Sequence, residues 1–178
     1  MANPQNKQTI VHLKNPAEGS VWYPITDQLR FGDKGSTAFF AVDGEKASAT
    51  FTGELKLNEG AGFASYRTAV KLDLSQFDEI QIEVEGDGRE YKALIKDLAA
   101  KNSGQDYSYQ VSFTTLKNQS NHLHLNLKKF IPVYRGRIDL SLPTLNPAEI
   151  EEFGLQINDK NPGPYKIEFG EWTAVRTR

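Results

Sequence analysis

The chain has 178 residues, a formal net charge of −2 and 38% hydrophobic residues. This length suits one domain with a sizeable core, and the hydrophobic content excludes an intrinsically disordered chain. Lysine and arginine are scattered, so no basic stripe indicates nucleic-acid binding. The chain contains no cysteine, which excludes disulfides, thiolate zinc sites and a cysteine nucleophile.

The first residues, MANPQNKQTIVHLKNP, lack the apolar core of a signal peptide. No stretch of the chain approaches the roughly 20 apolar residues that a membrane span requires. We therefore expect no membrane span and a cytoplasmic protein. We also expect an N-terminal arm over residues 1–19, followed by a single β-sandwich domain over residues 20–178.

Apolar residues alternate with polar ones along most of the chain, which is the pattern of strands with one buried face. In chain order the rows are Phe51, Leu55 and Leu57; Ile80, Ile82 and Val84; Tyr91, Ala93 and Ile95; Tyr107, Tyr109, Val111 and Phe113; Leu123, Leu125 and Leu127; Phe153, Leu155 and Ile157; and Tyr165, Ile167 and Phe169. Many short strands with few helical signals predict an antiparallel β-sandwich or barrel.

Two dipeptides between these rows are typical of hairpin turns, Asp43-Gly44 and Asp87-Gly88. The second lies in GDGREY, which lacks the ligand spacing and flanking helices of a calcium loop and the following helix of a phosphate loop. We therefore interpret Asp87 and Gly88 as a structural turn of type I′ between two strands. Further along, Asn146-Pro147 predicts one or two helical turns ending near Gly154. After Phe169 the apolar phase slips by one residue, which predicts a bulge at Gly170.

Signals for catalysis and metal binding are weak. His122 and His124 share one face of a predicted strand, and His12 could join them, but no carboxylate completes a ligand set. The sequence has no GxSxG motif and singles out no pair of catalytic carboxylates. We therefore expect no enzyme, no metal, no cofactor and no catalytic residue.

Arginines next to aromatic residues are the better candidates for binding. Tyr134, Arg135 and Arg137 lie together after a predicted strand, and Arg67 follows Tyr66. Arginine recognises carboxylates bidentately and stacks on aromatic rings. The alternative is that these arginines form internal ion pairs, with Asp87 or Asp159 as partners. We name Arg67, Tyr134, Arg135, Arg137 and Trp22 as candidate ligand or partner contacts.

Four stretches in order resemble the complex I intermediate-associated protein 30 family over roughly residues 20 to 175. They are FTG (51–53) through GAGFASYRT (60–68), DLSQFDEIQIEVEGDGREY (73–91), FIPVYRGR (130–137) and EFGLQINDKNPGPYKIEF (152–169). The resemblance implies an all-β fold, an antiparallel jelly-roll β-sandwich of the galactose-binding-domain type, with one or two short helical turns. Members usually carry Asp, a VMGG-like segment and Ser near the N-terminal side. Here the segment DQLRFGDKGS, Asp27 to Ser36, lacks the Met and the paired Gly.

The resemblance implies two functions. The first is a non-enzymatic binding module, chaperone-like, that holds a protein partner such as subunits of a membrane-associated complex, because mitochondrial members assemble respiratory complex I. The alternative is a carbohydrate-binding module, since the implied fold is common among them. In such a module exposed aromatic rings stack on the sugar, and Trp22, Tyr23, Tyr66 and Tyr134 are the available platforms.

Overall fold

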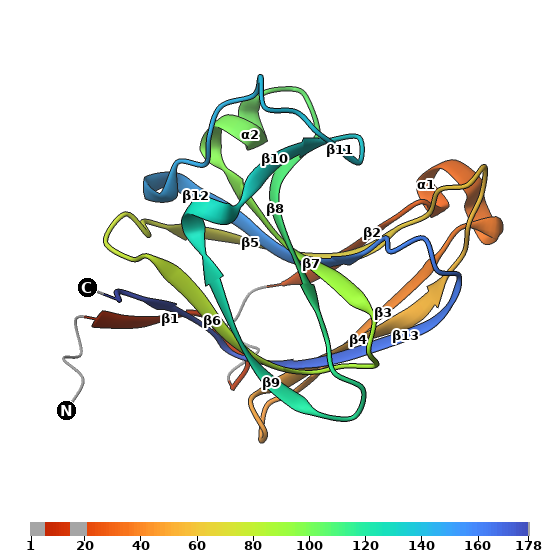
Figure 1. Cartoon of the computed structure of the whole chain (residues 1–178), viewed down its shortest axis with the longest axis horizontal. Coiled ribbons are helices and arrows are strands. Elements are labelled where there is room, and N and C mark those ends of the chain that lie inside the picture. Colours follow the sequence, from red (N-terminus) through yellow and green to blue (C-terminus); the bar gives the residue numbers. More distant parts are fainter. Residues whose placement is uncertain (1–5, 15–20, 178) are drawn as a thin grey trace.

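The computed structural model describes residues 6–14 and 21–177, which form two antiparallel sheets packed face to face (Figure 1). The first sheet contains β1 (Lys7–Val11), β3 (Thr37–Asp43), β4 (Ser48–Leu55), β6 (Glu79–Glu85), β9 (Ser120–Asn126), β13 (Gly163–Gly170) and β14 (Trp172–Val175). The second contains β2 (Trp22–Thr26), β5 (Ala64–Leu72), β7 (Glu90–Asp97), β8 (Tyr107–Thr114), β10 (Ile131–Tyr134), β11 (Arg137–Ile138) and β12 (Ile150–Ile157). The helical elements are short: α1 (Gln28–Phe31), α2 (Leu98–Asn102) and the 3-10 turns η2 (Gly32–Lys34), η3 (Leu127–Lys129) and η4 (Pro147–Glu149).

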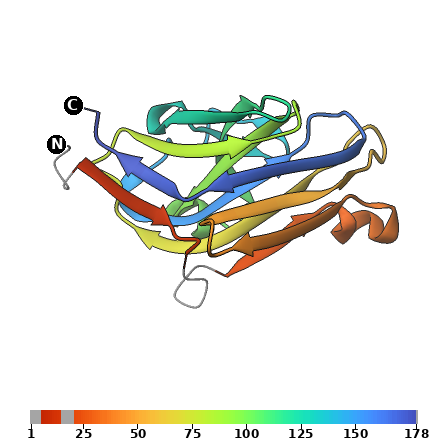
Figure 2. The same cartoon turned by 90° about the horizontal axis from the view of Figure 1, so that it is seen from below.

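The strand order of each sheet shows which segments of the chain lie side by side. In the second sheet the order is β11-β10-β8-β7-β12-β5-β2. In the first sheet β6 pairs with β9 and, on one side, with both β13 and β14. From β13 the sheet continues to β4, and from β14 it continues to β1. β1 and β14 therefore lie side by side (Figure 2). The predicted antiparallel β-sandwich with short helical turns is confirmed.

The core lies between the two sheets and follows the alternating rows of the sequence. Ile80, Ile82 and Val84 are buried on β6, as are Phe153, Leu155 and Ile157 on β12. At one side of the sandwich Phe40 of β3 stacks between Trp22 of β2, with ring centroids 4.7 Å apart, and Tyr66 of β5, at 5.0 Å. Because these strands belong to different sheets, the three rings join the two layers.

The predicted hairpin at Asp87-Gly88 is wrong, because β6 and β7 belong to different sheets. Gly88 has φ +89°, but Asp87 is not in the left-handed region that a type I′ turn requires at both central residues. The segment is a crossover that Asp87 holds in place. Its carboxylate accepts hydrogen bonds from the Tyr91 hydroxyl at 3.0 Å and the Lys166 backbone N–H at 2.8 Å.

The next residue, Arg89, anchors this crossover to the loop before β13. Its Nε and Nη2 donate to the two oxygens of Asp159, at 2.9 and 2.7 Å. Its Nη1 donates to the carbonyls of Gly163 and Pro164, at 3.2 and 2.8 Å, and Nη2 also donates to the carbonyl of Asn161. Asp159 is therefore the partner of Arg89, an arginine that the search for binding residues did not select.

Replacing Gly88 with alanine should lower the free energy of unfolding by about 1 kcal/mol, because an alanine is strained at positive φ. An added Cβ meets nothing closer than Lys117 Cβ at 3.6 Å, so the effect comes from the backbone alone. Urea unfolding measures it. Gly170→Ala is the matched control, since Gly170 has no positive φ and the nearest atom to its Cβ is 3.9 Å away. Equal stability of both variants would contradict the backbone conformation at Gly88.

Three further predictions concern the bulge at Gly170, the helical turn after Asn146 and the N-terminal arm. Phe169 pairs with Val84 of β6, and Thr173 pairs with Gln81. The segment from Phe169 to Thr173 is therefore one residue longer than the segment of β6 opposite it, which confirms the bulge at Gly170. The helical turn after Asn146 is shorter than predicted, since it ends at Glu149 and β12 begins at Ile150. Within the expected N-terminal arm, residues 6–14 are described, and Lys7–Val11 form β1 in the first sheet. The rest of the arm lies outside the described residues.

Candidate functional site

The hairpin that joins β10 and β11 carries three of the five candidate contact residues. Tyr134 pairs with Arg137, and the two residues between them, Arg135 and Gly136, have φ values of +48° and +75°. Positive φ at both central positions is the requirement of a type I′ turn, whose twist matches that of the flanking strands. The tight turn expected at Asp87-Gly88 is therefore found here, and it holds the arginines away from the core.

Apolar and cationic side chains are exposed together on this hairpin. Ile138 is 61% exposed and Leu140 is 76% exposed, next to the exposed Arg135 and Arg137. Neither arginine forms an ion pair with any residue in the described part of the chain. A hollow of about 530 Å³ is lined by Tyr134, Arg135, Arg137, Ile138 and Asp139. We call Tyr134, Arg135, Arg137, Ile138 and Leu140 the hairpin surface.

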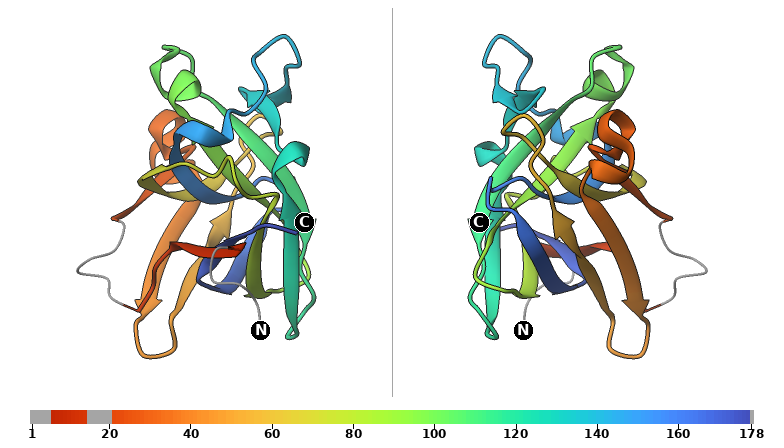
Figure 3. Two further views of the ribbon diagram at one scale, coloured as in Figure 1. Left: turned by 90° about the vertical axis from the view of Figure 1, so that its left-hand side faces the viewer. Right: turned by 90° about the vertical axis from the view of Figure 1, so that its right-hand side faces the viewer.

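Local contacts order part of this surface. The Arg135 guanidinium lies over the Tyr134 ring, 5.1 Å from its centroid, which is a cation–π geometry. Asp139 accepts hydrogen bonds from the backbone N–H of Ser141 at 3.0 Å and from its hydroxyl. These bonds lower the pKa of Asp139, so its carboxylate stays charged. The surface thus presents two cations and one anion beside exposed aliphatic groups, and it lies with α2 at one end of the sandwich, opposite the β3–β4 turn (Figure 3).

The structure places Arg67 and Trp22 elsewhere. Arg67 lies on β5, separated from β11 by β12, β7, β8 and β10. It is 5% exposed, with Nη1 3.3 Å from Glu152 Oε1 and Nε 3.2 Å from Ser65 Oγ. The internal ion pair considered as an alternative is therefore present for Arg67, with Glu152 as partner. Trp22 is half-buried against Phe40, so its ring belongs to the core.

The histidines lie on the outer face of the first sheet. His122 and His124 are neighbours on β9, with ring centroids 5.3 Å apart, and His124 Nδ1 is 2.8 Å from Glu79 Oε1. His12 is exposed, next to the end of β1. Within residues 6–14 and 21–177 no group of three or more potential ligands is arranged to hold a metal ion. The structure therefore offers these histidines one carboxylate partner, Glu79, that the sequence did not indicate.

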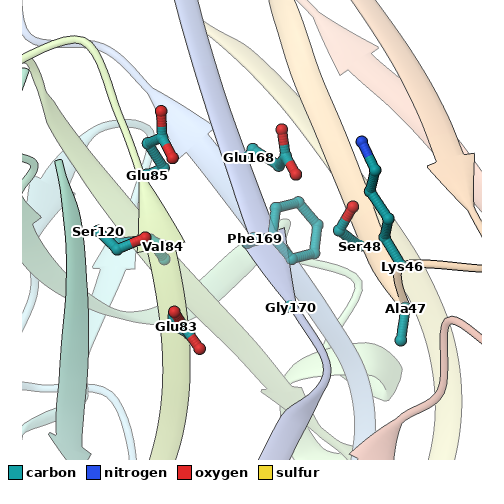
Figure 4. A pocket seen from close by; sticks show the side chains of 10 residues that line it. All are labelled: Lys46, Ala47, Ser48, Glu83, Val84, Glu85, Ser120, Glu168, Phe169 and Gly170. Atoms are coloured by element: carbon teal, nitrogen blue, oxygen red, sulfur yellow. The ribbon is translucent and has the colours of Figure 1, made fainter. Parts of the chain in front are cut away.

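A smaller hollow of about 210 Å³ lies on the same outer face and has acidic walls. Glu85 and Glu168 are direct neighbours on β6 and β13, and Glu83 and Lys46 line the same hollow (Figure 4). Like charges in register repel each other and stay hydrated, as is usual on the solvent face of an antiparallel sheet. The hollow therefore has the character of a hydrated solvent face.

The described helices are too short and too polar for any of them to cross a membrane. The paired seven-stranded sheets define a galactose-binding-like β-sandwich, a class of fold that occurs in carbohydrate-binding modules. The chain belongs to the complex I intermediate-associated protein 30 family, whose sequence profile matches residues 11–169. No curated protein matches the chain.

Solved structures resemble the chain in fold at low sequence identity. The family 11 carbohydrate-binding module of the cellulosomal cellulase Lic26A-Cel5E of Clostridium thermocellum is 12% identical, with a TM-score of 0.70 over 96% of this chain and 95% of that one. The Clostridium thermocellum family 11 module in complex with a β-1,3-1,4-mixed-linked tetrasaccharide is 13% identical, with a TM-score of 0.68 over 96% of each chain. At such identities the likeness establishes the fold alone.

The segment from Asp27 to Ser36, which departs from the family pattern, is closed by a contact between its two end residues. Asp27 Oδ1 accepts a hydrogen bond from the Ser36 backbone N–H at 2.6 Å, and both residues are buried. Ser36 Oγ then bonds the backbone of Lys56, which ties the segment to the end of β4. The Asp and Ser of the family pattern therefore close the α1–η2 loop here without the Met and the paired Gly.

Proposed function

We propose that this protein is a non-enzymatic binding module of the assembly-factor type, which holds a protein partner at the hairpin surface. The observation that carries the proposal is the joint exposure of Ile138 and Leu140 beside two arginines that form no ion pair with residues 6–14 or 21–177. Aromatic residues and arginine are enriched at protein interfaces, and a rigid turn presents them with little loss of entropy on binding. Family membership supports a partner that is a subunit or intermediate of a respiratory or other membrane-associated complex.

The charge of the hairpin surface indicates what the partner presents. Arg135 and Arg137 face solvent, and a partner segment with carboxylates would pair with them bidentately. Aliphatic side chains of that segment would cover Ile138 and Leu140. The partner is therefore an acidic segment with apolar residues, and association should weaken as salt screens the charges.

Carbohydrate binding is the second candidate function, and the named aromatic platforms do not favour it. Trp22 and Tyr66 pack on Phe40, and the Tyr134 ring is covered by Arg135. The fourth, Tyr23, is half-buried, and its hydroxyl group donates a hydrogen bond to Glu152. A sugar site in this protein would therefore depend on hydrogen-bonding groups and not on a stack of exposed rings.

Changing Arg135, Arg137 and Ile138 together to serine should release the protein partner. Truncation of residues at the centre of an interface typically weakens binding by about tenfold or more each. The measurement is affinity purification of the wild type and the variant from cells, with quantitative mass spectrometry of the retained proteins. We expect complex subunits to be retained by the wild type and lost from the variant.

The matched control is Leu29→Ser with Arg30→Ser on α1. Leu29 is 89% exposed, and Arg30 lies 4.9 Å over the Phe31 ring and pairs with Glu59, so these two changes remove an exposed aliphatic and a cationic group at another place. The control should retain every partner. If the triple variant and the control retain the same proteins, the hairpin surface is not the docking site.

A further inference from the structure

The outer face of the second sheet is unusually buried for a surface that no other layer covers. Side chains on this face form one cross-strand row in register, from β2 to β10: Tyr23, Arg67, Gly154, Leu94, Gln110 and Ile131. Leu94 is fully buried yet lies outside the core cluster between the sheets, and Gln110 is 8% exposed. On the outer face of the first sheet, by contrast, Glu83, Glu85 and both histidines of β9 are exposed.

The centre of this row is apolar and closely packed. A Cβ at Gly154 would lie 2.4 Å from Leu94 Cδ1 and 2.9 Å from Arg67 Cγ, so glycine lets both side chains lie over β12. The row crosses six strands, which is about 24 Å at the usual strand spacing. The middle of the sheet thus provides an apolar floor, and the whole row is long enough for an extended ligand.

Paired charges flank this floor. Glu152 accepts from Arg67 at 3.3 Å and from the Tyr23 hydroxyl, and Lys96 pairs with Asp106. Burial, together with the hydrogen bond to Glu152, raises the pKa of Tyr23, so its hydroxyl stays protonated. In these two pairs each charge has an opposite charge as partner, so the groups beside the floor add donors and acceptors with little net charge.

One buried acceptor on this face has no partner. The Gln110 amide donates from Nε2 to Ser108 Oγ at 3.0 Å, while its Oε1 makes no hydrogen bond to any residue of the described chain. A buried unpaired carbonyl is unfavourable, and such groups are rare unless something pairs with them. On the neighbouring strand Lys92 is half-buried, pairs in register with Gln156 and Ser112, and forms no ion pair with the described residues.

We propose that this face binds a neutral polyhydroxylated chain, an oligosaccharide, with Gln110 Oε1 and the Lys92 amine as hydrogen-bonding partners of its hydroxyl groups. A hydroxyl both donates and accepts, which matches an unpaired acceptor and a free donor on adjacent strands. An anionic ligand fits less well, because Glu152 and Asp106 lie on the same face. The proposal is independent of the hairpin surface, so either function stands or fails without the other.

Calorimetric titration with soluble linear gluco-, manno- and xylo-oligosaccharides, from tetra- to hexasaccharides, tests the proposal. We expect binding of at least one chain, weakened about tenfold by Gln110→Leu, which removes one hydrogen bond made in a desolvated place. Lys92→Met should weaken the same ligand. Gln110→Leu removes an unpaired buried acceptor together with the Nε2 hydrogen bond to Ser108 Oγ, and these two effects on stability oppose each other, so thermal unfolding should show the variant to be folded.

The matched control is His122→Leu, a change on the outer face of the first sheet that should leave affinity unchanged. The hairpin triple variant should also bind the sugar normally. No heat of binding with any oligosaccharide would overturn the proposal, and so would equal affinity of the wild type and Gln110→Leu.

Discussion

Replacing Arg89 with alanine should lower the free energy of unfolding by about 3–5 kcal/mol. The change leaves the Asp159 carboxylate, 12% exposed, without its cation and removes the donors to three backbone carbonyls, those of Asn161 before β13 and of Gly163 and Pro164 at its start. Arg89→Lys should recover little of the loss, because an ammonium group cannot reproduce the bidentate fork. Urea unfolding at neutral pH measures the difference.

The pH dependence of this loss distinguishes the ion pair from simple packing. Burial is the largest single influence on the pKa of Asp159 and raises it, but the hydrogen bonds from Arg89 and from the Asn161 backbone N–H, together with the charge of Arg89, hold the pKa below its usual range. The stabilisation from Asp159 is therefore present above the ordinary carboxyl pKa of about 3.9 and is lost as the pH falls through the lower folded pKa. The curves of wild type and Arg89→Ala should converge in acid.

The control is Arg30→Ala, which removes an ion pair with Glu59 that is exposed on both sides. Exposed pairs contribute at most about 1 kcal/mol. If Arg89→Ala proved as mild as Arg30→Ala, the crossover would not depend on the contacts seen here.

The strands were predictable because burial on one face leaves a period of two in the sequence. Ile80, Ile82 and Val84 show this directly, and the bulge near Gly170 is visible as a change of phase. Sheet membership was not predictable in the same way. Asp87-Gly88 has the local chemistry of a hairpin, yet the strands on either side enter different sheets, which depends on partners distant in sequence.

The candidate surfaces show the same limit. Tyr134, Arg135 and Arg137 lie within four residues, so their exposure on one turn follows from local geometry. Gln110 gave no signal, because a glutamine in an alternating strand is ordinary. Its missing partner becomes evident only when the neighbouring strands are in place. Arg67 differs again, since its guanidinium pairs with Glu152, a residue 85 positions away along the chain.

A last experiment separates a structural role of Arg67 from a contact role. Arg67→Met should lower the free energy of unfolding by about 3 kcal/mol, because it leaves the Glu152 carboxylate with the Tyr23 hydroxyl as its one remaining side-chain partner among the described residues. An uncompensated charge, and not the lost attraction, accounts for most of that effect. Neutralising the second partner should therefore restore stability.

The double variant Arg67→Met with Glu152→Gln should accordingly be more stable than Arg67→Met alone, which thermal and urea unfolding of the four proteins in the cycle will measure. Such non-additivity arises only where the two groups compensate each other in a poorly hydrated place. If Arg67 were a contact for a partner, Arg67→Met would leave stability unchanged and reduce partner retention. The first outcome is expected, because the Arg67 guanidinium is already bonded to Glu152 and Ser65.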